Sequence, residues 1–313
     1  MKPETMRKII DIDSRMVDLF NGIQYSYLNF NADNLLKLLF VLENKPGKRI
    51  SSFSKPDAEF AIINQKKIKG ILWCITTFLI DAKLFYYYQC KDRNIYPLIC
   101  IAYHLFNKDE DFLCDSENYW EKHNDEFISF KAWLYWFLLF NEESNKKVLM
   151  VPCEGLLHTF DAYSEELKLT ADDLDKCNTE FIVFLINERN AFGKEAYGHF
   201  MYPYQLKSYN YSKCDIDNVR NIEIVEDPAF LQVREVLSFV ERMKHFVVDK
   251  QLYITNSLIP ENEELWTEDR FLEFCEARGK LIADKVNQIF SGLKTELPPR
   301  IEQENRMRER HNN

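Results

Sequence analysis

Apolar residues recur every three or four positions through residues 1–175, which is the spacing of one face of an α-helix. The opening amphipathic stretch follows this rule at Met6, Ile9, Ile10, Met16, Val17, Phe20 and Ile23. Polar turns separate further helical stretches, expected at 35–42, from Asp57 through Trp73 to Tyr88, and at 94–106, 126–140, 156–167 and 174–187. The pattern predicts an N-terminal helical bundle.

The pattern changes near residue 176. Residues 222–225 alternate branched apolar side chains with Glu223, as a half-buried β-strand does. Helical periodicity returns in two later stretches, 230–246 and 266–290. We therefore expect a small α+β domain over residues 176–292, followed by a charged flexible tail over residues 293–313. The predicted fold class is mainly α.

Composition supports the helical prediction. The 313 residues include 46% hydrophobic residues but only 8 Gly and 10 Pro, which disfavours sheets with many tight turns and glycine-rich phosphate loops. The longest apolar runs, 71–80 and 127–140, are shorter than the roughly 20 residues that cross a bilayer. We therefore expect no membrane span.

The 8 cysteines occur singly, without a Cys-x-x-Cys pair. Zinc ribbons need paired thiolates, because two ligands from one tight turn preorganise half of the tetrahedron. Several cysteines lie in apolar runs, where a reduced thiol behaves as a small hydrophobe. The pattern excludes a zinc ribbon and predicts a cytoplasmic protein.

Three motifs occur in a fixed order: Tyr197-Gly198-His199-Phe200-Met201-Tyr202-Pro203-Tyr204-Gln205, then Arg220-Asn221-Ile222-Glu223-Ile224-Val225, then Trp266-Thr267-Glu268 leading into a helix that carries Arg278. This order resembles the C-terminal nuclease half of GmrSD-type, modification-dependent (type IV) restriction proteins, which belong to the HNH or ββα-metal class. The resemblance covers roughly residues 176 to 292. It implies a divergent ββα-metal-like domain. Trp266 is expected to be buried, since it precedes an amphipathic helix whose docking it would fix.

The resemblance also implies roles for two residues. His199 would be the general base that activates a water, and Asn221 would fix the loop that carries His199. A divalent metal, Mg²⁺ or Mn²⁺, would hold the scissile phosphate if the domain is an active endonuclease. The identities of the metal ligands are left open.

The chain departs from the family pattern at several positions. Gly198 stands where the family has an acidic residue, and Arg220 stands where it has Gly. The spacing from His199 to Pro203 is longer by one residue, and a second Asn expected on the following helix has no counterpart. Three interpretations of His199 therefore stay open: a structural histidine, the relic of a catalytic one, and a working base. We expect a degenerate active site.

A net charge of −10 is unusual for a protein that acts on nucleic acid alone, so any DNA-binding surface has to be local. The candidates are Arg234, Arg242, Lys244 and Lys250, with His245 between them. The alternative is a solvated helix face without function.

These observations favour a DNA-directed anti-phage defence component, with DNA as its expected substrate. The family also has a nucleotide-using, DNA-recognition domain, and no motif of it occurs here, so a separately encoded partner subunit is expected. The alternative is a non-enzymatic helical scaffold that binds another protein. Aromatic residues that suit an interface favour it, unless they pack in the core: Tyr86, Tyr87, Tyr88, Trp133 and Trp136.

Overall fold

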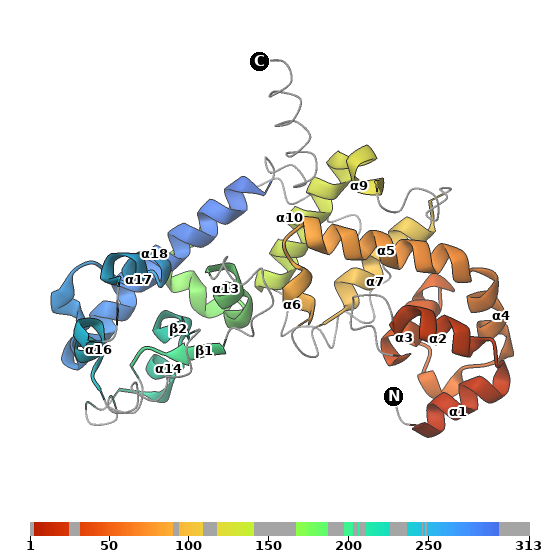
Figure 1. Cartoon of the computed structure of the whole chain (residues 1–313), viewed down its shortest axis with the longest axis horizontal. Coiled ribbons are helices and arrows are strands. Elements are labelled where there is room, and N and C mark those ends of the chain that lie inside the picture. Colours follow the sequence, from red (N-terminus) through yellow and green to blue (C-terminus); the bar gives the residue numbers. More distant parts are fainter. Residues whose placement is uncertain are drawn as a thin grey trace, which may run out of the picture. The chain divides into compact units, whose positions relative to one another are not determined.

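The computed structural model describes residues 3–24, 32–89, 94–108, 118–140, 167–186, 197–202, 211–225, 237–245 and 249–293, with the single residues 206, 209 and 247. The chain divides into two compact units (Figure 1). Unit 1 comprises residues 1–137 with 142–165 and 293–313, and unit 2 comprises 138–141 with 166–292. The predicted boundary at residue 175 lies inside unit 2, and the predicted tail beyond Leu293 lies outside the described residues.

Unit 1 consists of helices in the part that the structure describes. They are α1 (Pro3–Ile12), α2 (Met16–Gln24), α3 (Ala32–Leu42), η1 (Ile50–Ser52), α4 (Lys55–Ile63), α5 (Gln65–Asp81), α6 (Phe85–Gln89), α7 (Tyr96–Phe106), α9 (Tyr119–Lys122) and α10 (Asn124–Phe140). Helix α5 packs against α7, and α7 packs against α3 (Figure 1). The last residues of α10 belong to unit 2.

An aromatic cluster fills the core of unit 1. The ring of Phe78 lies 5.1 Å from Trp120 and 5.4 Å from Phe127, measured between centroids. The indole of Trp120 donates a hydrogen bond of 2.7 Å to the carbonyl of Cys74, which leaves no polar atom of this Trp without a partner. Among the aromatics that could have formed an interface, Tyr87, Tyr88 and Trp133 are buried, so core packing explains them.

Several predicted helices differ from the observed ones. The opening helix is broken between α1 and α2, and the helices expected at 230–246 and 266–290 begin at Phe239 and Phe271. The long helix expected from Asp57 to Tyr88 is divided: α4 ends at Ile63, Asn64 donates its side-chain amide to the carbonyl of Phe60, and α5 begins at Gln65. After α5 the chain turns at Lys83, which has a positive φ of 59°. The helix expected at 174–187 begins instead as a 3-10 turn, η3 (Ala171–Lys176), before α13 (Thr179–Ile186). A capping box between Thr170 and Asp173 starts that turn. The helix expected at 156–167 lies outside the described residues, apart from Leu167.

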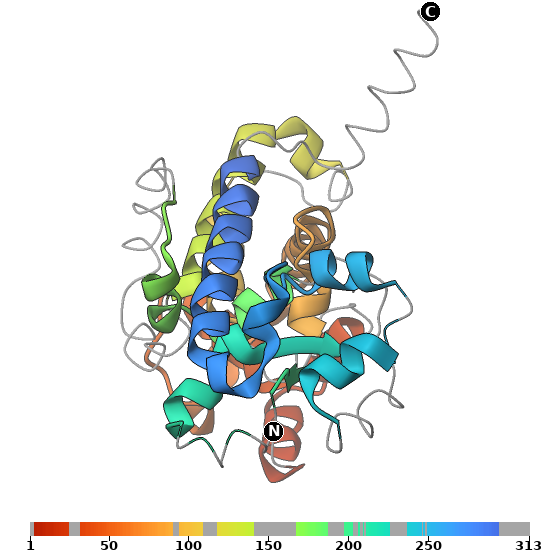
Figure 2. The same cartoon turned by 90° about the vertical axis from the view of Figure 1, so that its left-hand side faces the viewer.

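Unit 2 combines short helical segments with two strands, β1 (Tyr197–Phe200) and β2 (Ile222–Val225). Its helical segments after α13 are α14 (Lys213–Ile216), η6 (Val219–Asn221), α16 (Phe239–His245), α17 (Lys250–Asn256), η7 (Glu263–Trp266), η8 (Glu268–Arg270) and α18 (Phe271–Gly292). Helix α18 is the longest of them (Figure 2) and packs against η3, α13, η6 and η7. Residues 222–225, where alternation predicts a strand, form β2.

A hydrophobic core joins α16, α17 and α18 within unit 2. Trp266 lies in this core and is 2% exposed, as expected from its position before the amphipathic helix. Its indole donates a hydrogen bond of 2.8 Å to the carbonyl of Pro260, and its ring meets Phe239 edge-on. None of the helices in the described residues of either unit is long and apolar enough to cross a bilayer.

Candidate functional site

Strands β1 and β2 form an antiparallel pair in which His199 stands opposite Glu223 and Gly198 opposite Ile224. His199 is the third residue of β1, which ends at Phe200, and it lies two positions before Met201. The structure describes the backbone of His199 but not its side chain. The described side chains show how the backbone that follows β1 is held.

Asn221 lies at the end of η6, immediately before β2, and is completely buried. Its side-chain oxygen accepts a hydrogen bond of 3.0 Å from the amide of Tyr202, and its side-chain nitrogen donates to the carbonyls of Tyr202 (3.3 Å) and Ile216 (3.1 Å). An amide is suited to this position, because it offers a donor and an acceptor on one short side chain. These bonds hold the backbone of Tyr202, three positions after His199.

Arg242 comes to the same place from α16. It is 1% exposed, and a guanidinium nitrogen donates a short hydrogen bond to the carbonyl of Met201. The guanidinium carbon also lies 5.5 Å from the centre of the Phe239 ring. This burial corrects the assignment of Arg242 to a DNA-binding surface, since a side chain committed to the core cannot reach a phosphate backbone.

A second buried arginine, Arg278 on α18, holds the segment before Asn221. It donates to the carbonyl of Arg220 at 2.7 Å and to the carbonyl of Ser257 at 2.9 and 3.2 Å. Both acceptors lie where helical segments end, so these carbonyls have no helical partner. Arg278 thereby ties α18 to the turns that precede β2 and follow α17.

The side chain of Arg220 explains a glycine in the middle of α18. Arg220 extends across the helix to the carbonyl of Ala171 (2.7 Å) and the carboxylate of Asp175 (3.1 Å). A Cβ added at Gly279 would lie 3.0 Å from the Arg220 Nε and 3.2 Å from the Ala171 Cβ. Gly279 therefore leaves the space through which Arg220 passes.

The other predicted DNA-binding residues do not form one basic surface in the described residues. Lys244 is exposed on α16. Lys250 is paired with Glu263 at 2.6 Å, and its ammonium lies 4.9 Å from the centre of the Trp266 ring. Arg234 lies outside the described residues.

The side chains that the structure describes include no set that could hold a divalent metal. Gly198 supplies no ligand where the family has an acid, and no group of three His, Cys, Asp or Glu side chains converges among the side chains that the structure describes, which exclude those of His199 and Glu223. A hard cation needs several oxygen ligands or waters in a defined geometry.

The buried thiols of unit 2 are not activated. Burial raises the pKa of Cys177 to about 11 and that of Cys275 to about 12. Because only the thiolate is a nucleophile, both residues are inert near neutral pH. They are core side chains.

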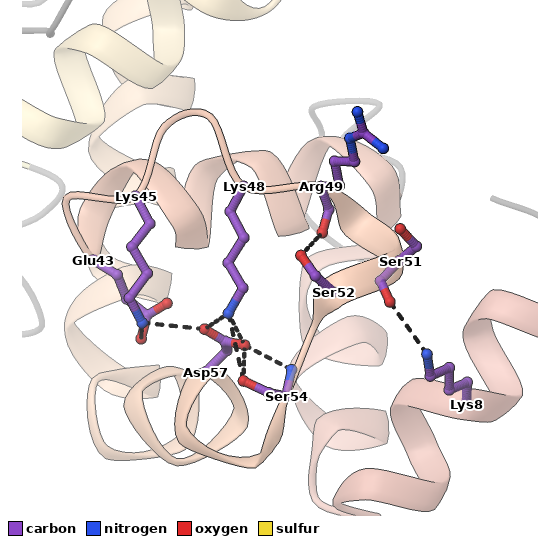
Figure 3. Close-up of polar contacts among 9 residues, drawn as sticks. All are labelled: Lys8, Glu43, Lys45, Lys48, Arg49, Ser51, Ser52, Ser54 and Asp57. Carbon is purple, nitrogen blue, oxygen red and sulfur yellow. Dashed lines mark hydrogen bonds and ion pairs between the residues drawn. The ribbon is translucent and has the colours of Figure 1, made fainter.

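Unit 1 holds a separate polar cluster around Asp57, at the start of α4 (Figure 3). Lys48 contacts both carboxylate oxygens of Asp57, at 2.5 and 2.6 Å, and Lys45 adds a longer contact of 3.3 Å. The amide and hydroxyl of Ser54 donate to the same carboxylate and complete a capping box. Burial alone would raise the pKa of Asp57, but these bonds hold it well below its usual range. The carboxylate is thus fully engaged in fixing the turn between α3 and α4.

A second carboxylate in unit 1 is equally engaged. Glu126 on α10 contacts His104 at 2.5 Å and Lys108 at 2.7 Å, and it accepts a hydrogen bond of 2.9 Å from the Tyr119 hydroxyl. Burial alone would raise its pKa, but the bonds from His104 and Lys108 lower it to about 2. A carboxylate held so firmly in its ionised form is a poor general base at neutral pH. The cluster ties α7, α9 and α10 together.

No family model, no curated protein and no solved structure matches this chain. The functional assignment therefore depends on the order of the sequence motifs and on the geometry of unit 2. Sequence reasoning found Asn221 from its motif but misassigned Arg242. A signal was present: Arg242 follows Phe239 by three positions and precedes Met243, on the apolar face of the helix.

Proposed function

We propose that this protein is a DNA-directed component of an anti-phage defence system, similar to the nuclease half of GmrSD-type restriction systems. It acts in the cytoplasm with a separately encoded, nucleotide-using partner that recognises modified DNA. Unit 2 is its divergent ββα-metal-like domain, in which the strands β1 and β2 support His199 and Asn221.

One observation carries the proposal: Asn221 binds both backbone groups of Tyr202, three positions after His199. In the ββα-metal class, as the resemblance implies, an asparagine fixes the loop of the catalytic histidine. All three of these side-chain hydrogen bonds of the buried Asn221 go to backbone groups, so the side chain is committed to holding this segment. Its position relative to His199 follows from the motif spacing.

The proposed domain has a degenerate catalytic set. Gly198 stands in place of the acid of the family pattern. The isolated chain is therefore expected to leave DNA uncut, and its contribution to defence depends on the partner. For the scaffold alternative, Tyr87, Tyr88 and Trp133 are buried and cannot anchor an interface, which leaves the half-buried Tyr86 and Trp136 as its candidate contacts.

The test is a phage challenge of cells that express this chain with the product of a neighbouring gene encoding the recognition domain. Protection is expected from the pair and from neither protein alone. Asn221→Ala should abolish protection, whereas Lys280→Ala, on the exposed face of α18, should preserve it. Protection that persists in Asn221→Ala, with the variant folded, would contradict the assigned site.

A second experiment addresses the chemistry. The purified chain is incubated with supercoiled plasmid and Mg²⁺ or Mn²⁺, alone and with the partner. We expect no nicking by the chain alone. Metal-dependent nicking that disappears in His199→Ala would show that the site is a working HNH endonuclease rather than a degenerate one.

A further inference from the structure

The residues Met201 and Tyr202, which follow β1, have all four of their backbone polar groups bonded. The amide of Met201 donates to the carbonyl of Asn221 at 2.6 Å, and the amide and carbonyl of Tyr202 bind the Asn221 side chain. The remaining group, the carbonyl of Met201, accepts from Arg242. Two residues, Asn221 and Arg242, therefore satisfy the whole dipeptide.

The two supporting residues come from different elements and are both buried. Asn221 precedes β2 and is 0% exposed, and Arg242 lies on α16 and is 1% exposed. A buried guanidinium is costly to desolvate, and an apolar side chain of similar size would fill the same core at lower cost. What an apolar side chain cannot do is donate to the carbonyl of Met201, which would otherwise be buried without a partner.

The side chain of Tyr202 adds a second anchor. Its ring packs between Phe239, Phe271 and Phe274, with centroid distances of 5.1, 5.3 and 5.1 Å. The backbone and the side chain of this residue are thus both held by the core of unit 2. The end of β1 has little freedom to move relative to α16 and α18.

We propose that Arg242 is a positioning residue: together with Asn221 it holds Met201 and Tyr202 and thereby fixes the end of β1 that carries His199. Arg242 touches neither DNA nor a reacting atom. Its effect reaches His199 through two residues of backbone. The importance of His199 rests on the proposed function. The hydrogen bonds of Arg242 and Asn221 to the backbone belong to the fold and do not depend on it.

The test compares two variants of α16 in the full chain. Arg242→Met keeps a long apolar side chain against Phe239 but removes the donor to Met201. Met243→Ala, at the next position in the same core, creates a cavity without removing a hydrogen bond to the strand end. Backbone hydrogen exchange is followed at Tyr202 and at Ile282, a buried reference on α18.

In Arg242→Met, exchange at Tyr202 should rise by about tenfold relative to Ile282, because the strand end opens locally. In Met243→Ala, the exchange rates of both amides should rise by the same factor. Arg242→Lys retains one donor and should restore part of the protection at Tyr202. Equal acceleration of Tyr202 and Ile282 in Arg242→Met would overturn the proposal and reduce Arg242 to a structural residue.

The imidazole resonances of His199, assigned by comparison with His199→Gln, provide a second readout. They should shift in Arg242→Met, return partly in Arg242→Lys and stay unchanged in Met243→Ala. Unchanged His199 resonances in a folded Arg242→Met would overturn the positioning role even if Tyr202 exchanges faster. Failure of the phage challenge leaves both readouts intact, so it would count against the proposed function and not against the role of Arg242 in the fold.

Discussion

The carboxylates of Asp57 and Glu126 in unit 1 and the buried Asn and Arg side chains of unit 2 bind different kinds of partner. In unit 1, Asp57 and Glu126 are held mainly by other side chains, among them Lys48 and Lys108. In unit 2, Asn221, Arg242 and Arg278 bind backbone groups.

The difference follows from local structure. A helix interior satisfies its own amides and carbonyls, so the two carboxylates of unit 1 find their partners mainly among side chains, while Thr76 and Thr77 share carbonyls of their own helix. Unit 2 contains turns and short segments whose carbonyls point into the core, and buried donors have to reach them. The carbonyls of this irregular backbone are satisfied by buried Arg and Asn side chains. The same side chains hold the backbone of the candidate site in place.

The largest expected effect is at Arg278. Arg278→Met should lower the free energy of unfolding of unit 2 by about 4 kcal/mol, because it leaves the carbonyls of Ser257 and Arg220 buried without a donor. Lys280→Ala, two positions along the same helix, breaks only an exposed pair with Glu276 and should cost about 0.5 kcal/mol or less. Urea unfolding of both variants measures the difference. Similar losses of unfolding free energy in the two variants would contradict the importance of buried donors to backbone in unit 2.

Trp266→Ala should destabilise unit 2 by about 3 kcal/mol, through lost burial and the cavity left beside Phe239. Trp266→Phe should cost less, since it fills part of the space but loses the bond to the Pro260 carbonyl. Thermal unfolding of unit 2 in both variants measures the two losses of stability. A neutral Trp266→Ala would show that the core of unit 2 does not depend on this side chain.

Unit 1 should respond to acid through Glu126. Its folded pKa of about 2 lies below the ordinary value of 4.5, so its contribution is present above pH 4.5 and is lost as the pH falls through the folded value. After a discount for partial exposure, the contribution is about 2 kcal/mol. Unfolding free energies between pH 7 and pH 2 should fall more steeply in the wild type than in Glu126→Gln. Parallel curves would mean that His104 and Lys108 contribute nothing through this carboxylate.

The smallest effect compares two buried tyrosines. The hydroxyl of Tyr119 in unit 1 donates to Glu126, so Tyr119→Phe should cost about 1 kcal/mol. The hydroxyl of Tyr202 in unit 2 is buried without a hydrogen-bond partner among the described residues, and burial raises its pKa. Tyr202→Phe should therefore be neutral or stabilise by up to about 1 kcal/mol. Calorimetry on both variants decides this, and a clear loss in Tyr202→Phe would mean that its hydroxyl has a partner.

Sequence periodicity predicted what depends on local patterns. The helical character of unit 1, the strand 222–225 and the burial of Trp266 each follow from the spacing of apolar residues. Periodicity could not predict the break at Asn64 or the 3-10 turn of η3, because both depend on side-chain bonds to nearby backbone. Whether such a bond forms depends on the tertiary contacts around the side chain.

For the same reason, some residues of the candidate site could be predicted from the sequence and others could not. Asn221 was found because its motif implied a role near His199. Arg242 was assigned to the surface because charge alone was considered, although the apolar neighbours on its helix face indicated burial. A long-range donor to a loop carbonyl leaves no local pattern, so the contacts of Arg242 and Arg278 had to be seen in the fold.

The bond between Arg278 and Arg220 bears on the order in which the chain folds during synthesis. The two residues are 58 positions apart, so at roughly 5–20 residues per second Arg220 leaves the ribosome some 3 to 12 seconds before its partner. During that interval the turn before β2 lacks its donor, and Asn221 has no fixed position from which to hold Tyr202. We therefore expect unit 2 to assemble late and as a whole, since contacts between distant residues form slowly. The backbone support of His199 should then form only when α18 docks.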